Sequence, residues 1–138
     1  MRKILLWCAS LAVLGLAACD SSTSSDSSST PSELVGIWKD SIPSYGTVIY
    51  LQLKSGGSGL VKAYTLYDNA LVGTDSAVGT WTASGGKLVV NAVYDGATIK
   101  DTAAYTVSGS SLTLKGSVLG TTGSYTFTKA TAIVAPKF

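Results

Sequence analysis

The sequence predicts an all-β fold: a small antiparallel up-and-down β-barrel of about eight strands, with a small β-sandwich as the alternative. From residue 33 onward, short runs of alternating apolar and polar residues recur, rich in Val, Ile, Thr and Tyr. Glycine-containing turns separate these runs at regular spacing, and no window shows a sustained 3.6-residue period. Evenly spaced short strands of this kind are typical of sandwiches and barrels.

Each strand is expected where such a run lies between two turn signals. The expected strands are Leu34–Lys39, Thr47–Lys54, Leu60–Tyr67, Ala77–Ala83, Lys87–Tyr94, Thr98–Val107, Ser111–Lys115 and Thr122–Lys129, with Ala132–Val134 as an extension of the last. Asp68-Asn69 and Asp95-Gly96 are hairpin signals because these residues tolerate the backbone conformations of tight turns. Alternation places Ile49, Leu51 and Leu53 on one face of the second strand. Consecutive hairpins therefore account for the whole domain.

Composition excludes several classes of function. The chain has 138 residues, with 10 Lys and Arg, 8 Asp and Glu, and no histidine. This length suits one domain. Arg2 and Lys3 fall in a segment that we expect to be removed, which leaves basic and acidic residues in equal number. A near-neutral domain without arginine does not fit a nucleic-acid-binding protein.

The N-terminus has the order of parts found in a signal peptide. A positive start, Met1-Arg2-Lys3, precedes an apolar run over residues 4–18 that is short for a membrane span. The run ends in Leu16-Ala17-Ala18-Cys19, which resembles a bacterial lipobox. We therefore expect residues 1–18 to be a lipoprotein signal peptide. An ordinary secretory signal that happens to contain a cysteine is the alternative.

The lipobox implies that processing machinery attaches diacylglycerol and an N-acyl chain to Cys19. Such acylation anchors a protein firmly. Residues 20–32 contain only Ser, Thr, Asp and Pro, so residues 19–32 are expected to be a lipidated cysteine and a disordered tether. Residues 33–138 would form the barrel domain. The expected location is the cell envelope: the periplasmic face of the inner or outer membrane, or the cell surface.

The domain resembles bacterial lipocalin-like domains. Gly36-Ile37-Trp38 is similar to the Gly-x-Trp signature of the first lipocalin strand, and Gly79-Thr80-Trp81 and Tyr125-Thr126-Phe127 look like later strands of such domains. The resemblance implies that Trp38 closes one end of the barrel and that Lys129 packs across its ring, where the family usually has arginine. The family's Thr-Asp-Tyr motif and C-terminal helix are missing. Trp38 as an ordinary core aromatic in another small β fold is the alternative.

The sequence predicts no enzyme, because it has neither histidine nor a free cysteine to form the usual nucleophile pairs. The acids are scattered and fit no metal site. Asp101 is a candidate inward-facing acid, between Ile99 and Ala103. Aromatic residues are the remaining candidates for ligand contact, and these are Tyr67, Trp81, Tyr94, Tyr105 and Tyr125. Packing of the core and rim is the alternative role for them.

Two functional hypotheses follow from these expectations. The first is a membrane-anchored lipoprotein whose barrel binds or carries a small hydrophobic ligand in the envelope. The alternative is a non-enzymatic interaction or structural lipoprotein with a filled β core, similar to META domains. Neither hypothesis requires a cofactor beyond the lipid on Cys19, and neither involves nucleic acid. An internal cavity would favour the first, and a closed core would favour the second.

Overall fold

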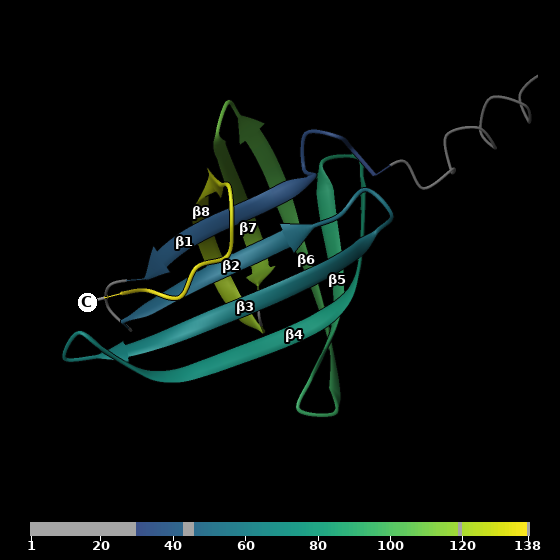
Figure 1. Cartoon of the computed structure of the whole chain (residues 1–138). Coiled ribbons are helices and arrows are strands. Elements are labelled where there is room, and N and C mark those ends of the chain that lie inside the picture. Colours follow the sequence, from purple (N-terminus) through teal and green to yellow (C-terminus); the bar gives the residue numbers. More distant parts are fainter. Residues whose placement is uncertain (1–29, 43–45, 119, 138) are drawn as a thin grey trace, which may run out of the picture.

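Eight antiparallel strands form a closed barrel in this computed structural model, which describes residues 30–42, 46–118 and 120–137. The strands are β1 (Gly36–Ile42), β2 (Thr47–Leu53), β3 (Ser58–Tyr67), β4 (Ala70–Ser84), β5 (Lys87–Tyr94), β6 (Ala97–Ser108), β7 (Ser111–Val118) and β8 (Thr121–Ala130). Each strand pairs with the next, and β1 also pairs with β8 (Figure 1). The predicted up-and-down barrel is confirmed, and the alternative sandwich is wrong. The expected signal peptide, Cys19 and residues 20–29 lie outside the described residues.

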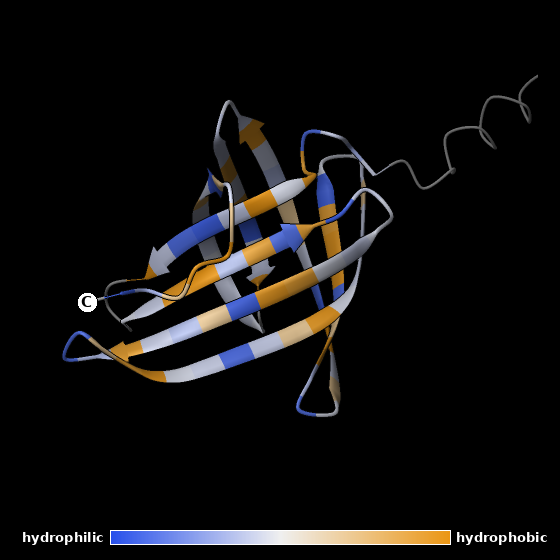
Figure 2. Cartoon of the chain, viewed as in Figure 1, coloured by the Kyte–Doolittle hydropathy of each residue, from blue (hydrophilic) through white to orange (hydrophobic). Residues whose placement is uncertain are grey.

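Alternation along the strands sends apolar side chains into the barrel. Hydropathy changes from residue to residue along the strands (Figure 2). In β2, for example, Ile49, Leu51 and Leu53 belong to the internal core, whereas Val48 and Tyr50 belong to a second cluster. Because side chains of a strand point alternately to its two faces, this second cluster lies on the outer face. The sequence pattern therefore sets the register of the sheet.

One hairpin is longer than expected. β4 begins at Ala70 rather than at residue 77, and it pairs with β3 as far as Tyr67 through an irregularity between Thr65 and Leu66. Asp68 and Asn69 form the turn with φ values of 48° and 61°. Asp and Asn adopt this left-handed conformation more readily than other non-glycine residues. Exposed apolar residues and a glycine conceal the alternation in this part of β4.

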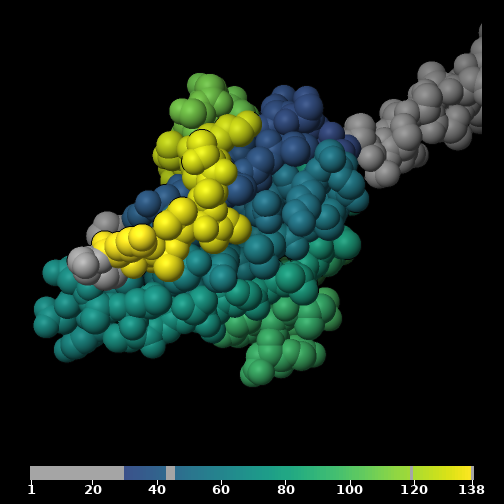
Figure 3. Space-filling model, in the orientation of Figure 1, coloured from purple at the N-terminus to yellow at the C-terminus, as the bar shows by residue number. Residues whose placement is uncertain are grey.

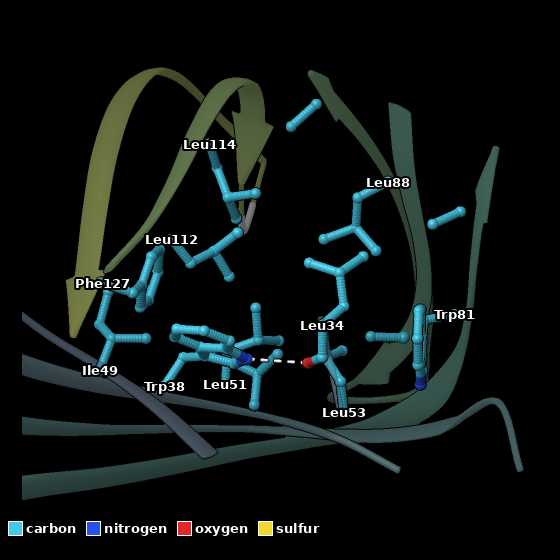
Figure 4. Packing of buried hydrophobic residues seen from close by; sticks show 14 of the residues in the cluster. Leu34, Trp38, Ile49, Leu51, Leu53, Trp81, Leu88, Leu112, Leu114 and Phe127 are labelled. Atoms are coloured by element: carbon cyan, nitrogen blue, oxygen red, sulfur yellow. Dashed lines mark hydrogen bonds between the residues drawn. The ribbon is translucent and has the colours of Figure 1, made fainter. Parts of the chain in front are cut away.

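The barrel is closed at the end that carries the β2–β3, β4–β5 and β6–β7 turns, called here the closed end. Leu34 enters this end from the segment before β1 and has no exposed surface. The Trp38 indole N–H donates a hydrogen bond to the Leu34 carbonyl oxygen over 2.8 Å (Figure 4). The first strand therefore starts at Gly36, two residues later than expected. Leu34 serves as a plug instead.

The chain also packs against the barrel before its first strand and after its last strand. Thr30, expected in the tether, donates a hydrogen bond from its hydroxyl to the Ser55 carbonyl oxygen over 2.7 Å. Ala132–Val134 does not extend the last strand, because the chain turns across the outer face after Ala130 (Figure 3). There the Tyr50 hydroxyl donates to the Val134 carbonyl oxygen over 3.0 Å. This segment covers apolar side chains on the outside of β2 and β3.

Candidate functional site

The barrel contains a cavity of about 220 Å³. Its wall is mostly aliphatic, with Phe127 and Tyr94 as the aromatic members. Leu34, Trp38 and Trp81 fill the closed end and are not part of this wall. Three wall residues, Asp75, Ser76 and Tyr94, are exposed to solvent, so the cavity reaches the surface. The end that carries the β3–β4, β5–β6 and β7–β8 turns is called here the open end.

Small side chains create this space. Four consecutive strands, β3 to β6, each contribute one alanine to the wall, and these are Ala63, Ala77, Ala92 and Ala103. Larger aliphatic residues such as Leu51, Leu88 and Leu114 surround the same volume. A barrel of eight strands is just wide enough for side chains to fill it, so a series of alanines leaves room inside. The local sequence therefore gives an internal cavity where a run of leucines would have given a packed core.

Two acidic side chains lie in this otherwise apolar wall. Asp101 is only 9% exposed, and its carboxylate accepts hydrogen bonds from the Ser117 hydroxyl at 2.5 Å and from the Gly120 backbone N–H at 3.1 Å. Asp75 accepts a hydrogen bond from the Tyr94 hydroxyl at 2.9 Å. This bond and the negative charge of Asp75 raise the pKa of Tyr94. The wall thus carries fixed carboxylates at defined positions.

The structure brings one of the five candidate aromatic residues, Tyr94, into the cavity wall. Tyr67 is 76% exposed at the tip of the β3–β4 hairpin and does not line the cavity, although it was a candidate for ligand contact. Trp81 is buried at the closed end, where its indole N–H donates to the Lys54 carbonyl oxygen over 3.0 Å. Tyr105 and Tyr125 pack against the core outside this wall. The packing alternative describes the positions of Trp81, Tyr105 and Tyr125, whereas the exposed Tyr67 takes neither expected role.

Trp38 and Lys129 meet at the closed end. They are cross-strand partners on β1 and β8, and the Lys129 Nζ atom lies 5.1 Å from the centre of the Trp38 ring. Trp38 is fully buried, whereas Lys129 stays exposed. An ammonium group at this distance over an aromatic face is attracted by the ring's quadrupole. Cys19, the expected site of lipidation, lies outside the described residues.

Sequence reasoning missed several residues that shape the site. It gave no role to Ser117 or Gly120, because contacts of a β6 side chain with the end of β7 and with the β7–β8 turn have no short-range signature. It also did not connect the inward alanines with a cavity, although alternation along the strands indicated that they face inward. In the part of the chain that the structure describes, no three His, Cys, Asp or Glu residues are placed to hold a metal ion.

Comparisons with protein families, with curated proteins and with solved structures find no match for this chain. Among the described residues, no helix has the length and apolar character needed to cross a bilayer. The features of this chain that bear on function are therefore the cavity and the sequence of the N-terminal segment.

Proposed function

We propose that this protein is a membrane-anchored lipoprotein of the bacterial cell envelope whose barrel binds or carries a small hydrophobic ligand. The observation that carries this proposal is the cavity of about 220 Å³ with a largely aliphatic wall. An apolar cavity of about 150 Å³ is known to accept benzene. Pockets for drug-sized ligands are larger, about 300–1,000 Å³. The size therefore suits a ligand of one ring or a short chain.

The position of the cavity agrees with attachment through Cys19. The described chain begins at Thr30 beside the β2–β3 turn, where its hydroxyl bonds to Ser55. That turn belongs to the closed end, and the first described residues lie there in Figure 1. The open end lies on the opposite side. A barrel tethered in this way leaves the entrance of its cavity free of the point of attachment.

The alternative of a filled structural core is less well supported. A filled barrel needs large side chains at the inward positions, and here four of these positions, on neighbouring strands, hold alanine. An empty apolar volume also removes van der Waals contacts, which costs about 24 cal/mol for each Å³ of cavity. In a binding site the ligand fills this volume and restores the contacts. In a purely structural barrel the cavity would only lower stability.

The binding role is tested by solvent extraction and mass spectrometry of the protein purified from cells. We expect a small apolar molecule to accompany it. Ala63→Phe places a ring in the cavity and should abolish this cargo. Ala104→Phe is the matched control, because Ala104 is exposed on the outside of β6. Equal cargo in both variants, or none in the unaltered protein, would contradict the proposed role.

The anchor is tested separately. Cys19→Ser removes the thiol that would carry diacylglycerol, so labelled palmitate should enter the unaltered protein and not the variant. Cys8→Ser is the control, since residue 8 lies within the expected signal peptide. Labelling that persists in the Cys19→Ser variant would refute acylation at this position.

A further inference from the structure

The cavity wall has an unbalanced charge. Asp75 and Asp101 contribute two carboxylates, and no lysine or arginine is among the lining residues. The other lining residues are uncharged. Charges interact more strongly across an apolar interior than across water, because the effective dielectric constant is lower. The interior therefore presents a negative potential to whatever enters.

Three lysines of the domain lie over aromatic rings away from this cavity wall. The Lys39 and Lys62 ammonium groups lie over the Tyr50 and Tyr64 rings, at 5.9 and 5.6 Å, on the outer face. Lys129 lies over Trp38 at the closed end. None of these three cations is available to neutralise a carboxylate in the cavity wall. A ligand with its own positive charge would supply the missing partner.

The two acids differ in setting, and both are held in place. Asp101 is nearly buried and is oriented by the Ser117 hydroxyl and the Gly120 N–H. Asp75 is exposed at the entrance and is bonded to the Tyr94 hydroxyl. Fixed hydrogen-bond partners keep a charged group ready for binding without further ordering, which is the main benefit of preorganisation.

We propose that the ligand of this cavity combines a small apolar body with a protonated amine, which is met by Asp101 and Asp75. This inference rests on the proposed binding function and specifies its ligand class. The aliphatic wall from Leu51, Leu88 and Leu114 receives the body, and the carboxylates receive the ammonium group. The same field rejects carboxylate ligands such as fatty acids, because like charges at close range repel.

Three probes of nearly equal shape test the charge preference. They are 2-phenylethylamine, which is cationic, 2-phenylethanol, which is neutral, and phenylacetate, which is anionic. The mature protein is held in zwitterionic nanodiscs and titrated with each probe by calorimetry, with empty nanodiscs as the blank. We expect the amine to bind about tenfold or more tightly than the alcohol, since hydrogen bonds to charged groups are the stronger ones. Phenylacetate should bind more weakly than both.

Substitutions of similar shape locate the charge. Asp101→Asn keeps an oxygen that accepts hydrogen bonds but removes the charge, so the preference for amine over alcohol should fall to about threefold or less. Asp75→Asn should reduce the preference at the entrance without a risk to folding, because Asp75 is exposed. Asp68→Asn in the exposed β3–β4 turn is the control with the same change in net charge, and it should leave the preference unchanged.

The outcomes distinguish failure of the amine inference from failure of the proposed binding function. Equal affinity for amine and alcohol, or tighter binding of phenylacetate, overturns the amine inference but retains an apolar binding site. An amine preference that survives both Asp101→Asn and Asp75→Asn also overturns it. Binding of none of the three probes overturns the proposed function together with the inference. Loss of the preference in either cavity variant, with the alcohol still bound, supports the inference.

Discussion

The Lys129 ammonium group lies 5.1 Å from the centre of the Trp38 ring, and Gly36 provides the room for it. A Cβ atom on Gly36 would lie 3.0 Å from Cε of Lys129, and the backbone there has a φ of 146°, which disfavours other residues. The Gly-x-Trp pattern thus has a physical meaning in this chain. The glycine lets the lysine cross the indole, and the indole covers the core.

A double-mutant cycle measures this contact. Trp38→Leu should lower the free energy of unfolding by about 2–4 kcal/mol, because it removes a fully buried ring. Lys129→Ala should cost about 0.5–2 kcal/mol. The double variant should lose less than the sum, since both changes remove one contact. Urea denaturation gives the three values.

Lys115→Ala serves as the control for this cycle. Lys115 is exposed on β7, so its effect should add to that of Trp38→Leu. Additive losses for the Trp38 and Lys129 pair would show that the ammonium group contributes nothing through the ring.

Leu34 is expected to carry much of the stability of the closed end. Leu34→Ala should lower the free energy of unfolding by about 2–5 kcal/mol, because the side chain has no exposed surface. Leu71→Ala, at the exposed β3–β4 hairpin, should change it by less than about 0.5 kcal/mol. Thermal and urea denaturation provide the comparison. If the two variants lose equal stability, Leu34 does not plug the barrel.

Gly79 lies where two strands approach closely. A Cβ atom there would fall 1.8 Å from the Asn91 carbonyl oxygen, so any side chain must displace the backbone of β5. Gly79→Ala should therefore cost about 2 kcal/mol or more. Gly56→Ala is the control, since nothing lies within 4 Å of its Cβ position. A neutral Gly79→Ala in chemical denaturation would mean that the strands are farther apart than the structure has them.

Stability is expected to depend on pH through the partly buried carboxyl group of Asp40. Burial raises its pKa above the ordinary value of 3.8, against a smaller opposing effect of the hydrogen bond from the Ser41 N–H. In the pH range between the unfolded and folded pKa values the native state holds more protons than the unfolded state, so stability falls as pH rises through that range. At neutral pH the charge of Asp40 is a cost.

Asp40→Asn should therefore raise the midpoint of thermal unfolding at pH 7, by an amount worth less than about 1 kcal/mol because the side chain keeps some contact with water. Below pH 3.8 the difference should vanish. Asp68→Asn in the exposed turn controls for the loss of one charge. An Asp40→Asn variant that is less stable at pH 7 would show that the charge is favourable in the folded state.

The sequence was sufficient for the architecture because alternation and turn chemistry are local. Eight runs such as Ile49 to Leu53 and turns such as Asp95-Gly96 predicted the strands, and the contact of Lys129 with Trp38 followed from the resemblance. Strand ends were less predictable. Ala70 to Ser76 lacked alternation, and Ala132–Val134 had a strand-like composition but packs as a covering segment.

The candidate site was predictable only in part. Asp101 was recognised as an inward candidate from its place between Ile99 and Ala103, but its partners Ser117 and Gly120 come from the end of β7 and the β7–β8 turn. Of the aromatic candidates, Tyr94 alone lines the cavity. The aromatic side chains indicated affinity for apolar ligands. The location of the cavity, however, depends on which small residues lie near one another inside the barrel. That arrangement requires the register of all strands.

Methyl NMR with benzene tests the central claim, an accessible apolar cavity, most directly. Leu51, Leu88 and Leu114 line the cavity, whereas Leu34, Leu53 and Leu112 belong to the same core but lie outside its wall, which makes them internal controls. The account predicts saturable methyl shifts at the first three leucines and small shifts at the other three. Shifts that are absent at all six, or that are equal in both groups and do not saturate, would contradict it.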